Sequence, residues 1–343
     1  MNLAVVAPND IAEVADHRIE LLDWMASQNL FGLSIQQDEA QLLEKHHRFA
    51  ITAEQDGQTS IRGFGRSVDK LTAATIASAE CIERYVSRKL LKEGVRASSR
   101  VIVEHGVIKT APGLDSGLPP SKGLHSSNGW AVHFSRELAI QNAAREALER
   151  HILLLSFIKY GWQGFHFSKP LVFQDCTVMQ GIAPVKVGGF GAGIVLTRGA
   201  KAPGATFGYI CERQREIETS KRWLGAFFES HEQWADLTSR PAGQDCSILE
   251  SYQRHYLDSP LQRPEASSPN LITQPRLAAN LAVLDLQEML KTSFPLFAAF
   301  AFGGNLVPLF LKQKLGGTEI AYVKGQLAKN GCEVDLPEFH PIL

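Results

Sequence analysis

The hydrophobic and polar positions of the chain change their spacing along the sequence. Helical spacing over 71–91, 137–158 and about 216–236 predicts three long helices. Short runs rich in Val, Ile and Phe predict strands, with a bulge expected at the glycine of the second run; these runs are 58–64, 101–108, 170–173 and 185–197. The alternation of strands with long helices predicts an α/β or α+β fold.

Segments rich in glycine and proline separate these elements. Two of them, 110–127 and 258–275, predict loops, and loops of this length are usually functional or disordered. The apolar run 293–311 is long enough to cross a bilayer. Because it contains prolines and a Gly-Gly-Asn sequence, we expect two buried segments around a turn instead. The glycines of 187–193 lack the context of a dinucleotide fingerprint and predict a tight entry into a strand.

Charge and cysteine usage exclude several classes of protein. The chain has 343 residues, with 35 Lys and Arg against 36 Asp and Glu. This balance argues against nucleic acid as the main partner and shows no polybasic membrane anchor. The five cysteines are scattered, so neither a structural zinc site nor a disulfide framework is expected. The first residues do not read as a signal peptide, and we expect a soluble, cytoplasmic protein.

A string of charged residues occurs twice, each time on an alanine-rich helix. Glu-x-x-Glu-Arg ends at Arg84 in the first helix and at Arg150 in the second, 66 positions later. At 100° per residue, each helix gathers its two glutamates and its arginine on one face, opposite an apolar back. The glutamates are Glu80, Glu83, Glu146 and Glu149.

The duplicated face has two interpretations. Each face alone is typical of a solvated helix with weak ion pairs. The repetition favours two helices that meet around a shared site, where four carboxylates require cations. Carboxylate oxygens select Mg²⁺ and a nearby arginine suits a phosphate, so the pattern indicates a Mg²⁺–nucleotide site. A di-iron bundle is excluded because none of the four glutamates is followed by a histidine three residues later, and a Walker site because no GxxxxGK[ST] occurs.

The motifs resemble those of the YcaO family. The resemblance is carried by the Gly-Phe-Gly of 63–65, the Ser-Asn-Gly-Trp-Ala of 127–131 and the two Glu-x-x-Glu-Arg strings at the family's spacing. It is strong over about 55–160, looser through 235 and faint over the first 50 residues. We therefore expect an atypical N-terminal segment, 1–50, and a YcaO-like domain, 51–343, with mixed sheets and long helices.

The resemblance implies an enzyme that binds ATP and Mg²⁺ and phosphorylates the oxygen of a peptide-backbone amide. It implies that the four glutamates handle Mg²⁺ and phosphates, that Arg84 and Arg150 fix phosphate charge, and that Asn128 lies on a loop closing over the nucleotide. Read as a turn cap, Asn128 would have no such role. His231 would contact phosphate when protonated, or would be an ordinary surface histidine.

The chain departs from the family at other positions of the nucleotide pocket. Hydrophobic residues stand where the family commonly has polar ones, and a third-helix glutamate and arginine are replaced by alanine and histidine; these residues are Ile76, Phe134, Leu138, Ala226 and His231. The resemblance nevertheless implies a peptide-modifying synthetase subunit that forms thiazolines or oxazolines from Cys, Ser or Thr, in bacteriocin-like biosynthesis. The expected partners are a precursor peptide and a separate protein that binds its leader, and a homodimer is plausible. The alternatives are a thioamide- or amidine-forming enzyme and an inactive scaffold.

Overall fold

The computed structural model describes residues 8–27, 34–40, 46–55, 59–93, 96–114, 128–173, 176–199, 205–239, 273–308, 315–332 and 335–336. These residues form two compact units, which are treated separately. Unit 1 consists of 1–97, 129–143 and 282–300, and unit 2 consists of 98–128, 144–281 and 301–343. Helix α3 (Arg136–Tyr160) contributes its first eight residues to unit 1 and the rest to unit 2.

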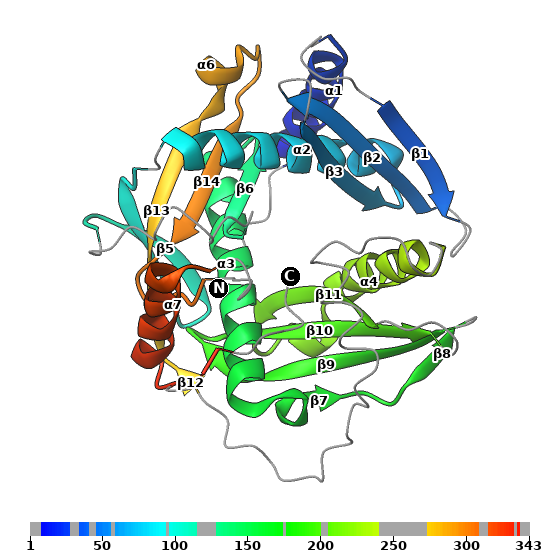
Figure 1. Cartoon of the computed structure of the whole chain (residues 1–343). Helices are drawn as coiled ribbons and strands as arrows, with labels where there is room; N and C mark the ends of the chain where they lie inside the picture. The colour runs from blue at the N-terminus through cyan, green and yellow to red at the C-terminus, as the bar shows by residue number, and fades with distance from the viewer. Residues whose placement is uncertain are drawn as a thin grey trace. The chain divides into compact units, whose positions relative to one another are not determined.

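Unit 1 is built on an antiparallel sheet with the strand order β1-β2-β3 (Figure 1). Helix α2 packs against β2 and β3, and helix α1 packs against α2. A second pair of antiparallel strands, β14 and β6, places Phe300 opposite Trp130. The elements are α1 (Pro8–Ser27), β1 (Ser34–Ala40), β2 (His46–Gln55), β3 (Thr59–Ser67), α2 (Lys70–Glu93), β6 (Trp130–His133), α6 (Leu286–Leu290) and β14 (Phe297–Phe302).

Two glycines let strand β3 lie directly on helix α2. A side chain at Gly63 would meet the carbonyl oxygen of Ala77, and one at Gly65 would meet that of Ala73. Both overlaps are far closer than a carbon atom tolerates, so only glycine fits at either position. The Gly-Phe-Gly sequence is therefore a packing requirement that fixes the helix against the strand.

Unit 2 contains a sheet with the order β11-β10-β9-β12, to which the short strands β7 and β8 add by pairing with β9. Helix α4 packs against β10 and β11 (Figure 1). The elements are η1 (Trp162–Gly164), β7 (His166–Phe167), β8 (Leu171–Phe173), β9 (Cys176–Val187), β10 (Phe190–Gly199), β11 (Ala205–Arg213), η2 (Ile217–Thr219), α4 (Arg222–Ser239) and β12 (Thr273–Gln274).

The core between this sheet and α4 is apolar and tightly packed. Trp223 is buried beside Ala226, and its indole Nε1 donates a hydrogen bond of 2.6 Å to the carbonyl of Ile217. Gly208 of β11 lies against the backbone of α4, because a side chain there would meet the carbonyl of Ala226. The register of α4 on the sheet is thereby fixed at its second turn.

Unit 2 also has antiparallel strands in the order β5-β4-β13, with β4 (Ser99–Glu104), β5 (Val107–Ala111) and β13 (Arg276–Asp285), whose residues 276–281 pair with β4. In unit 2, helix α7 (Gly317–Lys329) is followed by Asn330, which binds three neighbours. Its amide donates to the carbonyls of Asn305 and Gln326 and accepts a 3.0 Å bond from Gln274. His151 Nδ1 accepts from the backbone of Val307, so buried polar groups tie α3 and the segment after β14 together.

Most of the predicted elements are confirmed, and the bounds of three of them are wrong. The first two long helices are α2 and α3, and their apolar backs are buried. The predicted strand 101–108 is instead a hairpin, β4 to β5, whose two-residue turn places His105 and Gly106 at positive φ. The third helix begins at Arg222 instead of near 216, after a short 3-10 turn.

The apolar run 293–311 was expected to turn at its Gly-Gly-Asn sequence, and this is confirmed. Strand β14 ends at Phe302, and Gly303 and Gly304 both have positive φ. Among the described helices none is long and apolar enough to span a membrane. Gly188 and Gly189 make a tight turn into β10, as predicted, whereas Gly191 and Gly193 lie within β10. The predicted strand 185–197 is wrong in its bounds, because this turn separates the end of β9 from β10. The loop interiors at 115–127 and 258–272 lie outside the described residues.

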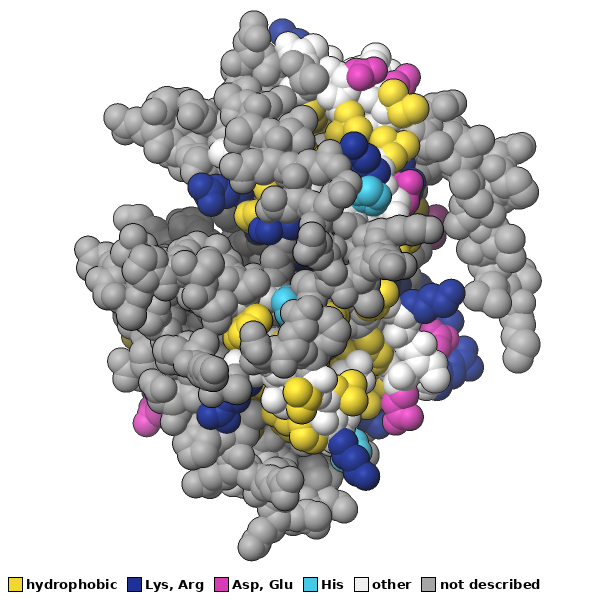
Figure 2. All heavy atoms as spheres, turned by 90° about the vertical axis from the view of Figure 1, so that its right-hand side faces the viewer, with side chains coloured by type: hydrophobic (Ala, Val, Ile, Leu, Met, Phe, Trp, Pro, Cys, Tyr) yellow, Lys and Arg dark blue, Asp and Glu magenta, His cyan; other side chains and the backbone are white. Residues whose placement is uncertain are grey.

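The described surface mixes charge types. Figure 2 shows one face, on which basic, acidic and hydrophobic side chains lie among one another. Exposed hydrophobic side chains include Leu171 and Val172 of the short strand β8. Single exposed apolar residues of this kind are ordinary in folded proteins, so they point to no site by themselves.

Candidate functional site

The first Glu-x-x-Glu-Arg string lies on α2 in unit 1. The carboxylate of Glu80 accepts a 2.6 Å hydrogen bond from the backbone N–H of Phe64 and forms an ion pair with Arg84. Arg84 also donates to the carbonyl of Arg62 on β3. Glu83 is partly buried on the same helix. Since each oxygen of Glu80 has one contact and a carboxylate offers about four acceptor sites, Glu80 is held in place and keeps capacity for a cation.

The second string lies on α3 in unit 2, and it is more deeply placed. Glu149 and Arg150 each expose only 14% of their side chains, and Arg150 Nε lies 3.7 Å from the Glu149 carboxylate. The Arg150 guanidinium also stacks on the ring of Tyr209, 4.2 Å from its centroid. Glu146 is near enough for its charge to act on Arg150. Two ionisable groups are thus kept in surroundings where charge is costly.

In unit 2 the surroundings of Glu149 shift the pKa of its carboxyl group. Its pKa is raised from 4.5 to about 7, chiefly by burial; the charges of Arg150, Arg222 and Arg145 oppose the rise, and the charge of Glu229 adds to it. Burial alone would lower the pKa of Arg150, but the charges of Glu149, Tyr209, Glu146 and Glu229 together outweigh burial, and the pKa is raised. Glu149 therefore changes protonation near neutral pH, whereas Arg150 stays charged.

Arg150 retains an unused donor. Its Nη1 atom is buried and has no hydrogen-bond partner among the described residues. A buried donor without a partner costs free energy, and such groups in native proteins call for an explanation. An oxyanion bound beside Arg150 would satisfy the donor, because a guanidinium binds phosphate or carboxylate oxygens well.

Several residues of this region were missed by the sequence analysis. Tyr209 lies on β11 and Glu229 on α4, and both act electrostatically on Arg150. Arg145 and Arg222 act on Glu149 from α3 and α4. Only the packing of these elements brings the residues together, so no local spacing could have identified them; Arg145 alone stood beside the second string.

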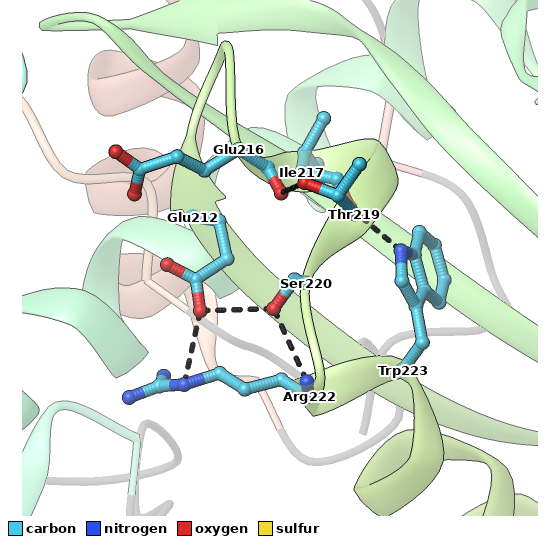
Figure 3. Close-up of polar contacts among 7 residues, drawn as sticks. All are labelled: Glu212, Glu216, Ile217, Thr219, Ser220, Arg222 and Trp223. Atoms are coloured by element: carbon cyan, nitrogen blue, oxygen red, sulfur yellow. Dashed lines mark hydrogen bonds and ion pairs between the residues drawn. The ribbon is translucent and has the colours of Figure 1, made fainter.

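Glu212 organises the beginning of α4 (Figure 3). Its carboxylate accepts a 3.2 Å hydrogen bond from the hydroxyl of Ser220 and lies 3.0 Å from Arg222 Nε. Ser220 Oγ in turn accepts from the backbone N–H of Arg222. The first residue of α4 is therefore held through both its backbone and its guanidinium.

Two departures from the family pattern gain a physical reason. Ala226, where the family has a glutamate, is buried in the apolar core below α4 and lies against Gly208, so a carboxylate there would be desolvated. His231 is 3% exposed and packs between Phe227 and Trp234, which contradicts its interpretation as a surface histidine. Burial lowers its pKa, which disfavours the protonated form, and a contact of His231 with phosphate stays a prediction.

The remaining departures lie in unit 1. Phe134 is buried against Phe294 and His17, where it contributes to the core. Ile76 and Leu138, by contrast, are exposed hydrophobic side chains. Asn128 begins a turn that continues through Gly129 at a φ of 81° and leads into β6. This place suits a turn residue, and a role for Asn128 toward a nucleotide stays a prediction.

A preformed metal centre is absent from the described residues, and the phosphate chemistry of the two strings stays a prediction. Within the described part of the chain, no group of three or more His, Cys, Asp and Glu side chains could hold a metal ion. Mg²⁺ usually takes one or two carboxylates and completes its shell with phosphate oxygens and waters. Pairs of glutamates with a nearby unsatisfied guanidinium fit that mode of binding. The expectation that the two helices share one site stays a prediction.

Several solved structures are similar to this chain. One is a heterocyclase in complex with substrate and cofactor. The match covers 95% of this chain and 56% of the heterocyclase chain, with 12% identity and a TM-score of 0.53. YcaO from Methanopyrus kandleri bound with AMPPCP and Mg²⁺ matches over 84% of this chain and 91% of its own, with 14% identity and a TM-score of 0.46. The E. coli microcin synthetase McbBCD complex with pro-MccB17 bound matches over 79% and 88%, with 11% identity and a TM-score of 0.37.

The comparisons establish the fold. No family model matches the sequence, and no curated protein matches it. The chain has the fold of the heterocyclase and spans little more than half of that protein's length. The predicted YcaO-like α/β fold is thereby confirmed. The division of the chain into an N-terminal segment, 1–50, and a YcaO-like domain, 51–343, stays a prediction.

Proposed function

We propose that this chain is a divergent YcaO-type subunit that uses ATP and Mg²⁺ to activate backbone amides of a ribosomal precursor peptide. The observation that carries the proposal is the buried pair of Glu149 and Arg150, with an unsatisfied donor on the arginine. Buried ionised groups are costly, and perturbed pKa values concentrate at functional sites. The fold shared with a heterocyclase supports the same assignment.

The proposal assigns roles to individual residues. The four glutamates hold Mg²⁺ and orient the phosphates, and the two arginines neutralise phosphate charge; these residues are Glu80, Glu83, Glu146, Glu149, Arg84 and Arg150. Asn128 lies beside the nucleotide. Tyr209 holds the Arg150 guanidinium over its ring and so positions the free donor. In phosphoryl transfer, such positioning and charge neutralisation supply most of the catalysis.

The chemistry follows from the weakness of an amide oxygen as a leaving group. When bound, ATP would supply the phosphoryl group that lets this oxygen depart as phosphate. A Cys, Ser or Thr side chain of the peptide adds to the amide carbon first, and loss of phosphate with a proton then leaves a thiazoline or oxazoline. The peptide loses one water in total. A separate protein that binds the leader of the peptide is the proposed partner.

Nucleotide binding gives the first test, because it requires no peptide. We expect AMPPCP to bind the purified protein in the presence of Mg²⁺ and to bind much more weakly with EDTA. Glu146→Gln and Glu83→Gln should each weaken binding at least tenfold, since each removes a charge from the Mg²⁺ and phosphate site. Glu288→Gln, an exposed change on α6, is the matched control. Equal binding by all variants would contradict the assignment of the glutamates.

The second test identifies the reaction. The protein, its leader-binding partner and a precursor peptide are incubated with Mg²⁺ and ATP, and the peptide mass is measured. Release of ADP with loss of one water from the peptide supports cyclodehydration. ATP turnover without that loss indicates another nucleophile, namely sulfide for a thioamide or an amine for an amidine. If AMPPCP does not bind under any condition, the chain is a scaffold.

A further inference from the structure

The arginine of the first Glu-x-x-Glu-Arg string is bound to its own unit through both ends of its guanidinium. Arg84 lies one turn after Glu80 on α2 and pairs with the Glu80 carboxylate through Nη2. Its Nη1 donates a hydrogen bond to the backbone carbonyl of Arg62 on β3. The two terminal nitrogens of Arg84 therefore already have partners on α2 and β3.

The corresponding arginine of the second string, Arg150 on α3, is held in a different way. Its Nε lies 3.7 Å from the carboxylate of Glu149, which is too long for a hydrogen bond. Its guanidinium lies over the ring of Tyr209, and its buried Nη1 has no hydrogen-bond partner among the described residues. Arg150 therefore keeps a donor for a bound group, and the two strings are alike in sequence but not in their contacts.

Strand β3 completes a closed ring of contacts around Glu80. One oxygen of the Glu80 carboxylate accepts from the N–H of Phe64, and the other faces Arg84. Arg84 returns to the same strand at the carbonyl of Arg62, two residues before Phe64. Both oxygens of Glu80 are thereby fixed in direction. Such contacts orient a carboxylate for a metal ion, because the groups bonded to a metal ligand set its geometry.

We propose that Arg84 is a positioning residue, which holds Glu80 in the orientation that binds Mg²⁺ and donates no hydrogen bond to the phosphates, whereas Arg150 does. The inference rests on the proposed function and narrows the part given there to Arg84, whose charge acts through Glu80. A guanidinium suits this task because its planar fork reaches a carboxylate and a carbonyl at once. The two arginines of the repeated string are therefore not interchangeable.

The test measures the affinity of each protein for AMPPCP twice, with Mg²⁺ and with EDTA, and takes the ratio of the two affinities as the metal enhancement. Arg84→Gln should lower the enhancement about tenfold and leave the affinity in EDTA within about twofold, because only a metal ligand is disturbed. Arg150→Gln should lower the affinity in EDTA about tenfold, because a phosphate donor is lost. Arg88→Gln, an exposed change one turn further along α2, is the control for charge and should alter neither value.

A double variant separates positioning from direct contact. Glu80→Gln should itself lower the metal enhancement, and adding Arg84→Gln should lower it further by no more than about twofold, because Arg84 acts through Glu80. Losses that multiply in the double variant would mean that Arg84 contacts the ligand itself, which overturns the inference. Urea denaturation shows whether each variant is folded, and Arg84→Lys takes the place of Arg84→Gln if the latter is not.

The outcomes separate this inference from the proposed function. If the wild-type protein binds no AMPPCP, the proposed function is overturned and the inference with it. If the wild type binds AMPPCP and both arginine variants lose the same affinity in EDTA, the inference alone is overturned, because both arginines then contact phosphate. An unchanged metal enhancement in Glu80→Gln overturns it as well, since Arg84 would then have no metal ligand to position.

Discussion

The Cζ atom of Arg150 lies over the ring of Tyr209, 4.2 Å from the ring centroid. The arginine comes from α3 and the tyrosine from β11, so this stack joins the helix that carries the second Glu-x-x-Glu-Arg string to the sheet of unit 2. A cation over an aromatic face is held in orientation as well as in place. The contact therefore orients the guanidinium of Arg150, whose Nη1 atom has no hydrogen-bond partner among the described residues.

The stack predicts a graded response at Tyr209. Tyr209→Phe keeps the aromatic face and should lose little free energy of unfolding. Tyr209→Leu removes it and should cost about 1–2 kcal/mol, because a desolvated cation–π contact has roughly this strength. Urea denaturation of the three proteins measures the difference. Equal costs for the two variants would show that the ring face contributes nothing beyond its volume.

Glu149 predicts a stability that depends on pH. Its pKa is raised from 4.5 to about 7 in the folded chain, so between these values the folded state holds more protons than the unfolded state. Stability should therefore fall as pH rises from 4.5 to 7, by on the order of 3 kcal/mol at most. Glu149→Gln should lack this contribution.

The measurement is the free energy of unfolding of both proteins at intervals across that range. The difference between wild type and Glu149→Gln isolates the carboxyl from its charged neighbours, which are Arg150, Glu229, Arg222 and Arg145. A constant difference over the whole range would mean that Glu149 titrates normally in the folded chain.

His151, the next residue but one, predicts the opposite slope. Burial lowers its pKa from 6.5 to about 4, although a hydrogen bond with Gln274 opposes the shift. Between these values the unfolded state binds more protons, so the contribution of His151 is present above pH 6.5 and is lost as pH falls toward 4. The loss is on the order of 3 kcal/mol at most.

Replacement of His151 by phenylalanine tests this slope. The variant also leaves the N–H of Val307 without its acceptor, which lowers stability at every pH by about 1–2 kcal/mol. Wild type should therefore be more stable than His151→Phe at pH 7, and the advantage should shrink in acid. An advantage that grows as pH falls would contradict the buried neutral histidine.

Two glycines of unit 2 give a pair of opposite predictions. Gly208→Ala places a methyl group against the carbonyl of Ala226 and should cost about 1–3 kcal/mol of unfolding free energy. Gly225→Ala lies on the exposed side of α4, where nothing is within 4 Å, and should gain roughly 0.5–1 kcal/mol from helix propensity. Thermal and urea denaturation of both variants measure the two changes.

The sequence was sufficient to predict the long helices α2 and α3, because each has a buried apolar face and a charged face. It was insufficient for the hairpin at His105 and Gly106, because a non-glycine residue at positive φ is uncommon and its neighbours continue the strand pattern. The repeated glutamates drew attention to α2 and α3. Glu229 and Tyr209 were missed because their relation to Arg150 exists only in the packed fold.

Gly63 and Gly65 make strand β3 and helix α2 touch backbone to backbone at two successive turns of the helix. Sliding or rolling of the helix would drive the carbonyl of Ala73 or Ala77 into the strand. The Glu80 carboxylate on helix α2 also holds strand β3, because it accepts a hydrogen bond from the N–H of Phe64. A ligand that displaces Glu80 must therefore move strand β3 and helix α2 together as one rigid body. The hinge of any such motion lies at the ends of this pair.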